Sequence, residues 1–489
     1  MSKNTTKRAL LSSVFALVLC VAMLVGSTFA WFTDTATTGV NKIVSGKLDV
    51  DIIGADSNDH VSDLKFTKAA MTDTEASAEI LWEPGCRYLT EGFRIANKGN
   101  LALKWKAQVN TGTTAANDGN FDLLDVIDFY LVTKAADGTE TETALDVFTG
   151  NLKKTETSDV YYIKGVMQTT AGNDYQGLTL DGISITVVAT QDTVENDSFN
   201  NQYDKDAEYP ILVTTGDQLQ ATVNNATAPV NIVLANSITT NNFVIPADKD
   251  VTLDLNGRTV TNAGSHTILN KGHLTLTDSS ADKSGQIISL KGNTAALRNG
   301  DNAVCVVEGG TISRDGANGN TWHVVENFGK MTFNGGKVVL KNGNGFAITN
   351  GWNYFDPGAS TTHAVMEINA LELDTDSSGI KNCRYGDLTV NDVTVASTGY
   401  WALSNDYLGT AVINGGTLTS NSFKAVSNGA TMTVNGGTFN GTSGLFVQSY
   451  ATSTVLNGGT FANMTVDALS SYVGTGHTAQ QSGTSVIIK

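Results

Sequence analysis

The chain has 489 residues, of which 49 are Gly, only 5 are Pro and 16% are charged. This composition is typical of an extracellular β-rich protein and argues against a mainly helical enzyme. The formal net charge of −17 argues against nucleic acid and anionic membranes as partners, because an acidic surface repels both.

Residues 1–30 have the anatomy of an export signal. Basic residues near the start precede an apolar run from Ala9 to Gly26, and small residues stand before the junction between Ala30 and Trp31. This pattern predicts a cleaved signal peptide and a secreted chain. The apolar run is also long enough for an uncleaved membrane anchor, which stays open as an alternative.

Cysteine is sparse, and one of the four cysteines lies inside the signal. They are Cys20, Cys86, Cys305 and Cys383. The three that remain after cleavage give no disulfide framework. The secreted chain must therefore be held by packing and backbone hydrogen bonds.

Residues 31–205 alternate short apolar runs with turn signals such as Glu83-Pro84-Gly85. The pattern predicts an all-β unit, an antiparallel jelly-roll-like β-sandwich. The expected strands are Gly46–Ile53, Ser77–Trp82, Gly92–Ala96, Leu101–Val109, Val126–Val132, Val160–Val166 and Leu178–Thr190. The first strand lies so close to the new N-terminus that it will be ordered only if another strand pairs with it.

Several short motifs within residues 1–205 follow one another in a set order. They are Trp31-Phe32-Thr33-Asp34 at the mature start, Gly46-Lys47-Leu48-Asp49, Pro84-Gly85 and the segment Asn97–Ala102. Together with the signal, this set resembles the TasA/camelysin family of secreted matrix proteins. Cys86 departs from the family pattern, which usually has Asp at that place.

The resemblance implies a SipW-type signal peptide cut by a dedicated signal peptidase, and a place at the cell surface or in the biofilm matrix. It also implies self-association or assembly with related matrix subunits. In the resembled family the mature N-terminal segment is thought to insert as a donor strand into the next subunit. Carried over, Trp31 to about Asp51 would be the donor and residues 77–190 the acceptor, since an added strand satisfies an open sheet edge.

An acidic, polar stretch that ends at Pro210 marks a domain boundary. Residues 206–250 are expected to be a linker and a cap, with a short helix near Thr215–Asn225 and a strand at Val230–Leu234. Residues 251–489 then repeat themselves with a base period of about 22 residues, the mark of a β-solenoid. The repeats resemble right-handed parallel β-helix, pectate-lyase-like domains of bacterial surface proteins.

Asparagine recurs at two positions of this repeat. One register is Asn256, Asp278, Glu308, Asn334, Asn369, Asn391, Asn414, Asn435 and Asn457. The other is Asn270, Asn299, Asn327, Asn350, Asn382, Asn405 and Asn428. Because stacked coils place equivalent residues about 4.8 Å apart, these side chains are expected to form structural amide ladders.

Catalytic chemistry has a weak signal in the sequence. The nearest candidate cluster for a polysaccharide-active enzyme is Lys381, Arg384, Asp387, Asp392 and Asp406, whereas hydrolases of this kind need paired carboxylates. The six histidines show no metal-ligand spacing. We therefore expect no catalytic residue, no cofactor and no resident metal, although acidic Asn-rich loops such as 374–378 leave calcium as an alternative.

Aromatic residues follow the ladder asparagines in several consecutive coils. They are Phe328, Trp352, Tyr354, Phe355, Tyr385 and Tyr407. In stacked coils they would gather along one edge, where aromatic faces bind sugar rings or protein partners. The alternative is that they only cover the core beneath the long insertion at residues 351–363.

These observations predict a non-enzymatic, secreted cell-surface or biofilm-matrix structural protein. Its sandwich would form fibres by donor-strand exchange, and its β-helix would serve adhesion. The alternatives are a polysaccharide-active lyase or hydrolase, and a monomeric adhesin that binds a glycan or a protein. The partners expected are like subunits, the signal peptidase and glycans.

Overall fold

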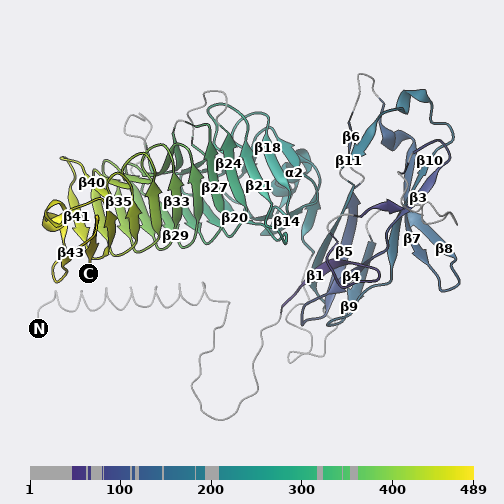
Figure 1. Ribbon diagram of the computed structural model, residues 1–489. Coiled ribbons are helices and arrows are strands. Elements are labelled where there is room, and N and C mark those ends of the chain that lie inside the picture. Colours follow the sequence, from purple (N-terminus) through teal and green to yellow (C-terminus); the bar gives the residue numbers. More distant parts are fainter. Residues whose placement is uncertain are drawn as a thin grey trace, which may run out of the picture. The chain divides into compact units, whose positions relative to one another are not determined.

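The computed structural model (Figure 1) describes residues 47–489 except 62–63, 68–79, 81, 111–112, 116–120, 146–147, 182, 193–208, 316–322, 344 and 353–361. The predicted signal peptide, with its junction at Ala30 and Trp31, lies outside the described residues, and so does Tyr354. No helix among the described residues is long and apolar enough to cross a membrane.

Residues 47–192 form antiparallel sheets. The largest has the order β1-β4-β10-β3-β2, and β7 joins it by pairing with β10 on one side and β8 on the other. Its strands are β1 (Val50–Gly54), β2 (Phe66–Thr67), β3 (Arg87–Thr90), β4 (Phe93–Asn97), β7 (Ile127–Lys134), β8 (Glu140–Ala144) and β10 (Tyr161–Met167).

Two smaller sheets complete this domain. One has the order β12-β5-β9, and the other pairs β11 with β6. Their strands are β5 (Leu103–Asn110), β9 (Phe148–Leu152), β12 (Ser184–Gln191), β6 (Thr113–Ala115) and β11 (Thr179–Asp181), and two short 3-10 turns are η1 (Leu123–Asp125) and η2 (Asn173–Tyr175).

The core of the domain lies between the largest sheet and the three-stranded sheet. Phe93, Ile95 and Ile163 of the first pack with Leu103 and Trp105 of the second, and all five are almost completely buried. Alternate residues of facing sheets build such an interior. The predicted all-β, sandwich-like domain is confirmed, and it has the form of a half-barrel.

The strand predictions succeed where apolar residues alternate and fail elsewhere. The single strand expected at Leu178–Thr190 is wrong, because β11 pairs with β6 while β12 pairs with β5. The expected strand Ser77–Trp82 lies mostly outside the described residues. β8 and β9 were not predicted, since neither shows an uninterrupted apolar face.

The first strand pairs within its own domain. β1 runs antiparallel to β4 in a register that sets Val50 opposite Asn97. The turn after β4 also holds the chain before β1, because Lys98 N–H donates to Asp49 O at 2.8 Å and Asn100 N–H to Lys47 O at 3.0 Å. Gly99 permits this close approach, since a Cβ there would stand 2.2 Å from Lys47 O.

The chain from Ile211 onward is a parallel β-solenoid with three faces. The strands of the first face are β13 (Ile211–Val213), β14 (Val230–Leu234), β17 (Asp250–Asp254), β20 (His273–Thr277), β23 (Val304–Val307), β26 (Lys330–Phe333), β29 (Ala364–Ile368), β32 (Gly386–Val390), β35 (Thr410–Ile413), β38 (Thr431–Val434) and β41 (Ser453–Leu456). Successive strands are parallel, as the predicted repeat requires.

The second and third faces follow the same rule. The second face has β15 (Ile238–Thr240), β18 (Thr259–Asn262), β21 (Gln286–Ser289), β24 (Thr311–Asp315), β27 (Lys337–Lys341), β30 (Glu372–Thr375), β33 (Thr394–Ser397), β36 (Thr417–Ser420), β39 (Thr438–Asn440) and β42 (Gly459–Ala462). The third face has β16 (Phe243–Ile245), β19 (Ile268–Asn270), β22 (Leu297–Asn299), β25 (Val325–Asn327), β28 (Phe346–Asn350), β31 (Ser378–Asn382), β34 (Leu403–Asn405), β37 (Val426–Asn428) and β40 (Leu445–Val447).

Both ends of the solenoid are capped. Near the first coil lies α2 (Gly216–Asn225), whose Leu219 and Val223 are buried and whose N-cap Thr215 accepts from Gln218 N–H. This helix and β14 stand where the sequence placed them, and β14 to β16 already form a coil. The last coil is followed by α3 (Val466–Leu469), η3 (Ser470–Tyr472) and the hairpin β43 (Ala479–Ser482) and β44 (Ser485–Ile488), with β44 antiparallel to β42. Such caps protect sheet edges from pairing with other chains.

A buried amide ladder runs along the third face, as predicted. From Asn270 to Asn428 each Nδ2 donates to the Oδ1 of the asparagine in the next coil, at 2.7–2.9 Å. All seven side chains are fully buried. Since buried amides must be hydrogen-bonded, the ladder fixes the stacking register of the coils.

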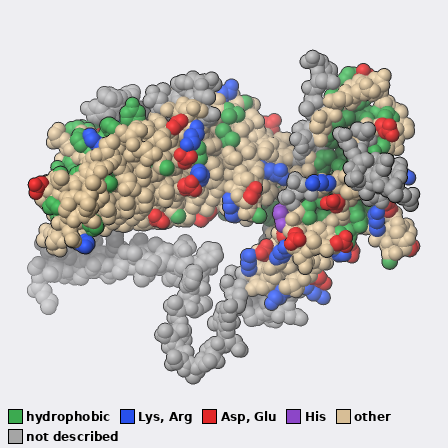
Figure 2. All heavy atoms as spheres, in the orientation of Figure 1, with side chains coloured by type: hydrophobic (Ala, Val, Ile, Leu, Met, Phe, Trp, Pro, Cys, Tyr) green, Lys and Arg blue, Asp and Glu red, His purple; other side chains and the backbone are tan. Residues whose placement is uncertain are grey.

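A second ladder lies exposed between the first and second faces. From Asn369 to Asn457 each Nδ2 donates to the preceding coil, at 2.7–2.9 Å. The earlier anchors take other roles, since Asn256 donates to Leu234 O while Asp278 accepts from Gly257 and Gly285 N–H. Much of the solenoid surface carries uncharged polar groups, and charged side chains of both signs lie beside each other on it (Figure 2).

Candidate ligand-binding cavity

A cavity of about 490 Å³ opens along one edge of the solenoid, where third-face strands turn into first-face strands. Its walls come from the turns after successive ladder asparagines, from Asn350 onward. The lining residues are Trp352, Lys381, Cys383, Arg384, Asp406, Tyr407, Leu408, Gly429, Tyr450 and Thr452. Because coils stack in register, residues that follow the ladder in different coils come together here.

Trp352 is held in place by backbone pairing. Its N–H donates to Arg384 O at 3.0 Å, and Arg384 N–H donates to Trp352 O at 3.2 Å. Its ring packs on Phe328, with ring centroids 4.5 Å apart. The indole Nε1 is buried and has no hydrogen-bond partner among the described residues, which is unusual for a buried Trp.

The structure brings together part of the aromatic set predicted from the sequence. Trp352 and Tyr407 line the cavity, whereas Phe328 lies behind Trp352 and is only 9% exposed. Tyr385 does not line it, and its ring contacts His363 and the Arg384 guanidinium instead. Tyr354 lies outside the described residues.

Two exposed apolar residues of the rim were not predicted. Leu408 is 50% exposed and Tyr450 is 59% exposed, beside Tyr407 at 45%. Leu408 stands three residues after Asn405, and Tyr450 stands three residues after Val447, which is paired with Asn428. The offset from Asn405 is a sequence signal that would have found Leu408, whereas the position of Tyr450 follows only from the pairing of Val447 with Asn428.

Three members of the candidate catalytic cluster also line the cavity. Lys381 Nζ lies 3.8 Å from Asp406 Oδ2. Arg384 Nη2 donates to Tyr385 OH at 3.1 Å, and its buried Nε has no partner in the part of the chain that the structure describes. Asp387 is not in the lining, and its carboxylate pairs with His363 at 2.8 Å.

The remaining polar groups of the cavity are unsuited to covalent chemistry. Burial raises the pKa of the Cys383 thiol to about 12, so the thiol stays protonated and is a poor nucleophile. Burial, then the nearby Asp406 carboxylate, raises the pKa of Tyr450. Asp392, the last member of the predicted cluster, is absent from the lining.

Backbone strain marks the same turns. Tyr385 has φ 58° and Leu408 has φ 61°, and the residue at the same offset from Asn299 is Asn302, with φ 62°. Asparagine tolerates this left-handed region, but a bulky side chain there costs about 1–2 kcal/mol. Tyr385 and Leu408 stand where other coils can use an asparagine, which adopts a positive φ more easily. This choice favours a role for the two side chains beyond turn formation.

One glycine makes room for the rim. A Cβ on Gly429 would lie 2.7 Å from the Tyr450 ring and 3.3 Å from Asp406 Oδ1. The missing side chain lets the ring settle over the turn. The lining of the cavity combines two cations and one carboxylate with the exposed side chains of Tyr407, Leu408 and Tyr450, which form its rim.

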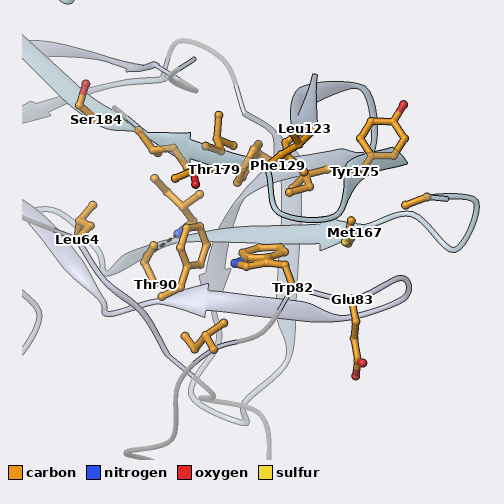
Figure 3. A pocket seen from close by; sticks show the side chains of 18 of the residues that line it. Leu64, Trp82, Glu83, Thr90, Leu123, Phe129, Met167, Tyr175, Thr179 and Ser184 are labelled. Atoms are coloured by element: carbon orange, nitrogen blue, oxygen red, sulfur yellow. Dashed lines mark hydrogen bonds between the residues drawn. The ribbon is translucent and has the colours of Figure 1, made fainter. Parts of the chain in front are cut away.

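The antiparallel domain has a second concave site. A cleft of about 920 Å³ is lined largely by apolar residues of that domain. Figure 3 shows Trp82, Leu123, Phe129 and Met167 converging on it from different elements. Gly165 makes space for the Trp82 ring, which a Cβ there would approach to 2.5 Å.

Comparisons with protein-family models, with curated proteins and with solved structures found no match. The class is therefore defined by the fold alone: an antiparallel β domain followed by a parallel β-solenoid of about ten coils. In the described part of the chain, no group of three or more His, Cys, Asp or Glu side chains is arranged to hold a metal ion.

Proposed function

We propose that this chain is a secreted structural protein of the bacterial cell surface or biofilm matrix, and that its solenoid binds a saccharide without cleaving it. The carrying observation is the cavity whose rim presents Tyr407 and Tyr450 beside Trp352. Exposed aromatic faces over a polar floor suit a sugar, which has apolar ring faces and hydroxyl edges.

The composition of the cavity favours binding over hydrolysis. Asp406 is the one carboxylate among its lining residues in the described chain. Hydrolases need two carboxyl groups about 5–9.5 Å apart. The lining residues are therefore sufficient for binding a saccharide but lack the second carboxylate that hydrolysis needs. The polysaccharide-active enzyme stays the alternative.

The test is glycan-array binding by the full mature chain and by Trp352→Ala. We expect binding to fall at least about tenfold in the variant, because removal of a buried anchor at the centre of a site costs more than 1 kcal/mol. Trp401→Ala is the matched control, since that ring packs on Phe423 and Phe446 and does not line the cavity.

Two results would overturn this proposal. One is equal loss of binding in both Trp variants, which would indicate a general effect on the fold. The other is release of reducing ends or unsaturated sugars from the bound glycan, which would favour the enzyme.

The apolar cleft favours assembly into fibres as a second role. In the resembled family the N-terminal segment is thought to insert as a donor strand. A cleft lined by Trp82, Phe129 and Met167 is suited to alternate apolar side chains of such an added strand. Val50 and Asp51, the end of the donor segment expected from sequence, already pair with Asn97 and Ala96. The donor segment that we propose is therefore shorter than the one expected from sequence and comprises residues 31–46.

The assembly test compares chains that begin at Trp31 and at Gly46. Both keep β1, so their monomer unfolding temperatures should agree. Electron microscopy should show filaments only for the chain that begins at Trp31. Equal filament yield from both would exclude residues 31–45 as the donor.

A further inference from the structure

We propose that the solenoid cavity selects an anionic saccharide and that Arg384 binds its anionic group. This inference rests on the proposed saccharide binding and names the class of sugar. It is carried by an uncompensated guanidinium, by the local excess of positive charge and by the exposed aromatic side chains of the lining.

Arg384 is the cation of the cavity that lacks a counterion. The carboxylate of Asp406 already faces Lys381 and accepts from Tyr407 N–H at 3.1 Å. Asp387, the nearest acidic residue in sequence, is engaged by His363. In the described residues, no carboxylate lies within 4.0 Å of the Arg384 guanidinium, so its charge is available to a ligand.

Within the described part of the chain, two buried N–H groups of side chains that line the cavity have no acceptor. They are Arg384 Nε and Trp352 Nε1. The backbone bridge between Trp352 and Arg384 places these donors on paired segments. Each buried unsatisfied donor costs about 1–3 kcal/mol. Because both atoms are closed to solvent, a ligand would reach the Arg384 guanidinium through its terminal nitrogens.

The charge of the cavity contrasts with that of the chain. Two cations and one carboxylate line it, whereas the chain as a whole has a net charge of −17. A concave site with a local excess of positive charge concentrates anions in it. A planar guanidinium also matches carboxylate and phosphate oxygens better than an ammonium does.

The aromatic rim would bind the sugar ring that carries the anionic group. Tyr407 and Tyr450 are exposed aromatic residues of the lining, and Arg384 belongs to the same lining. A sugar ring that stacks at the rim would direct a carboxylate or a phosphate substituent toward Arg384. The shared chemistry is an anionic sugar, and the source can be a uronic acid or a sugar phosphate.

Isothermal titration calorimetry with the full mature chain tests this selection. The probes are a glucuronic acid-containing tetrasaccharide, the same tetrasaccharide after reduction of its carboxyl groups to neutral sugars, and a glycerol phosphate oligomer. We expect one anionic probe to bind roughly ten- to a hundredfold tighter than the neutral one, the range for hydrogen bonds to a charged group. Tighter binding of the first or the last probe identifies the carboxylate or the phosphate as the source.

Three variants separate the role of Arg384 from a general effect of charge. Arg384→Gln should abolish the preference, because the anionic probe should lose more affinity than the neutral one, whereas Arg384→Lys should keep part of the preference. Lys330→Gln removes an exposed cation that does not line the cavity, and it should change nothing. Thermal unfolding confirms that each variant is folded.

The outcomes distinguish this inference from the proposed function. Equal affinity for neutral and anionic probes would overturn the selection and leave saccharide binding intact. A preference that survives in Arg384→Gln would overturn the role of Arg384. Failure of any saccharide to bind the wild-type chain would overturn both.

Discussion

The two regions of this protein enclose their apolar interiors in different ways. The solenoid repeats one coil, is closed at both ends and has an interior filled by stacked rows of side chains. The antiparallel domain has sheets of unequal size and keeps a cleft of about 920 Å³. Binding sites therefore arise differently in the two regions. In the solenoid they arise where the turns depart from the repeat, and in the antiparallel domain they arise where the core is incompletely covered.

Residues after the ladder show what a departure from the repeat can do. Asn382 and Asn405 are alike in burial and hydrogen bonding, and both keep the coil in register. Arg384 and Leu408 follow them in turns whose sequences differ between coils. Since the ladder and the apolar core lie inside the coils, the turns outside them can differ in sequence and build a site.

The largest expected effect tests whether the buried ladder is essential to the solenoid. In Asn405→Ala, Asn382 Nδ2, Asn428 Oδ1 and the Thr431 carbonyl each lose a hydrogen-bond partner. Asn382 Nδ2 keeps its bonds to Gly386 O and Thr410 O, and Asn428 Oδ1 still accepts from Ala430 N–H. We therefore expect a loss of roughly 3 kcal/mol, because three hydrogen bonds worth about 0.5–1.5 kcal/mol each are removed from a buried site. Hydrogen exchange should show lost protection in β34 to β38 and unchanged protection in residues 47–192. Loss spread equally over both regions would contradict their independence.

The next prediction concerns the antiparallel domain alone. In Gly99→Ala the new methyl group would lie 2.2 Å from Lys47 O, so the backbone before β1 must move. We expect a loss of roughly 2 kcal/mol, within the range for overpacked sites, with deprotection in β1 and β4. Gly172→Ala is the control, since nothing lies within 4 Å of its new Cβ. Unchanged hydrogen exchange in Gly99→Ala would contradict the view that the backbone hydrogen bond from Asn100 N–H to Lys47 O holds the chain before β1.

Sequence reasoning explained the solenoid better than the antiparallel domain, for a physical reason. A coil pairs with its neighbour in sequence, so the recurrence of Asn270 to Asn428 states the contacts directly. β8 has no apolar face, and it is ordered by pairing with β7. Pairing of that kind depends on tertiary contacts, which local patterns do not record.

The cavity was predicted in two pieces that the sequence could not join. The aromatic set and the cluster of Lys381, Arg384 and Asp406 were separate hypotheses, and stacking of the turns placed them on one wall. Tyr450 was missed because Val447 replaces the asparagine that marks its coil. Asp387 looked like a member but is paired with His363.

Acid should weaken the solenoid through two buried histidines. Burial lowers the pKa of His323 to about 4, and burial, then Arg298, lowers that of His266 to about 4. Their unfolded values are about 6.5. Below pH 6.5 the two histidines are protonated in the unfolded chain but stay neutral in the folded chain. The free energy of unfolding therefore falls as the pH drops toward 4, and then levels off.

His323 alone should cost the solenoid about 1 kcal/mol at pH 5.5 relative to pH 7.5. Thermal unfolding at the two pH values measures the difference, and His323→Gln should reduce it. In His266 the Nδ1 accepts from Ala295 N–H at 2.9 Å, so protonation there breaks a backbone hydrogen bond. A pH dependence that is unchanged in His323→Gln would contradict this account.

The smallest expected effect is the counterpart of the first. Asn414 has the same type of side chain as Asn405 and also donates to a neighbouring asparagine, at 2.7 Å from Nδ2 to Asn391 Oδ1. It is exposed, so water replaces the lost partners in Asn414→Ala, and the loss should stay below about 1 kcal/mol. Chemical denaturation of the two alanine variants side by side measures the contrast. Equal losses would show that the repeat of amides, and not their burial, stabilises the coil.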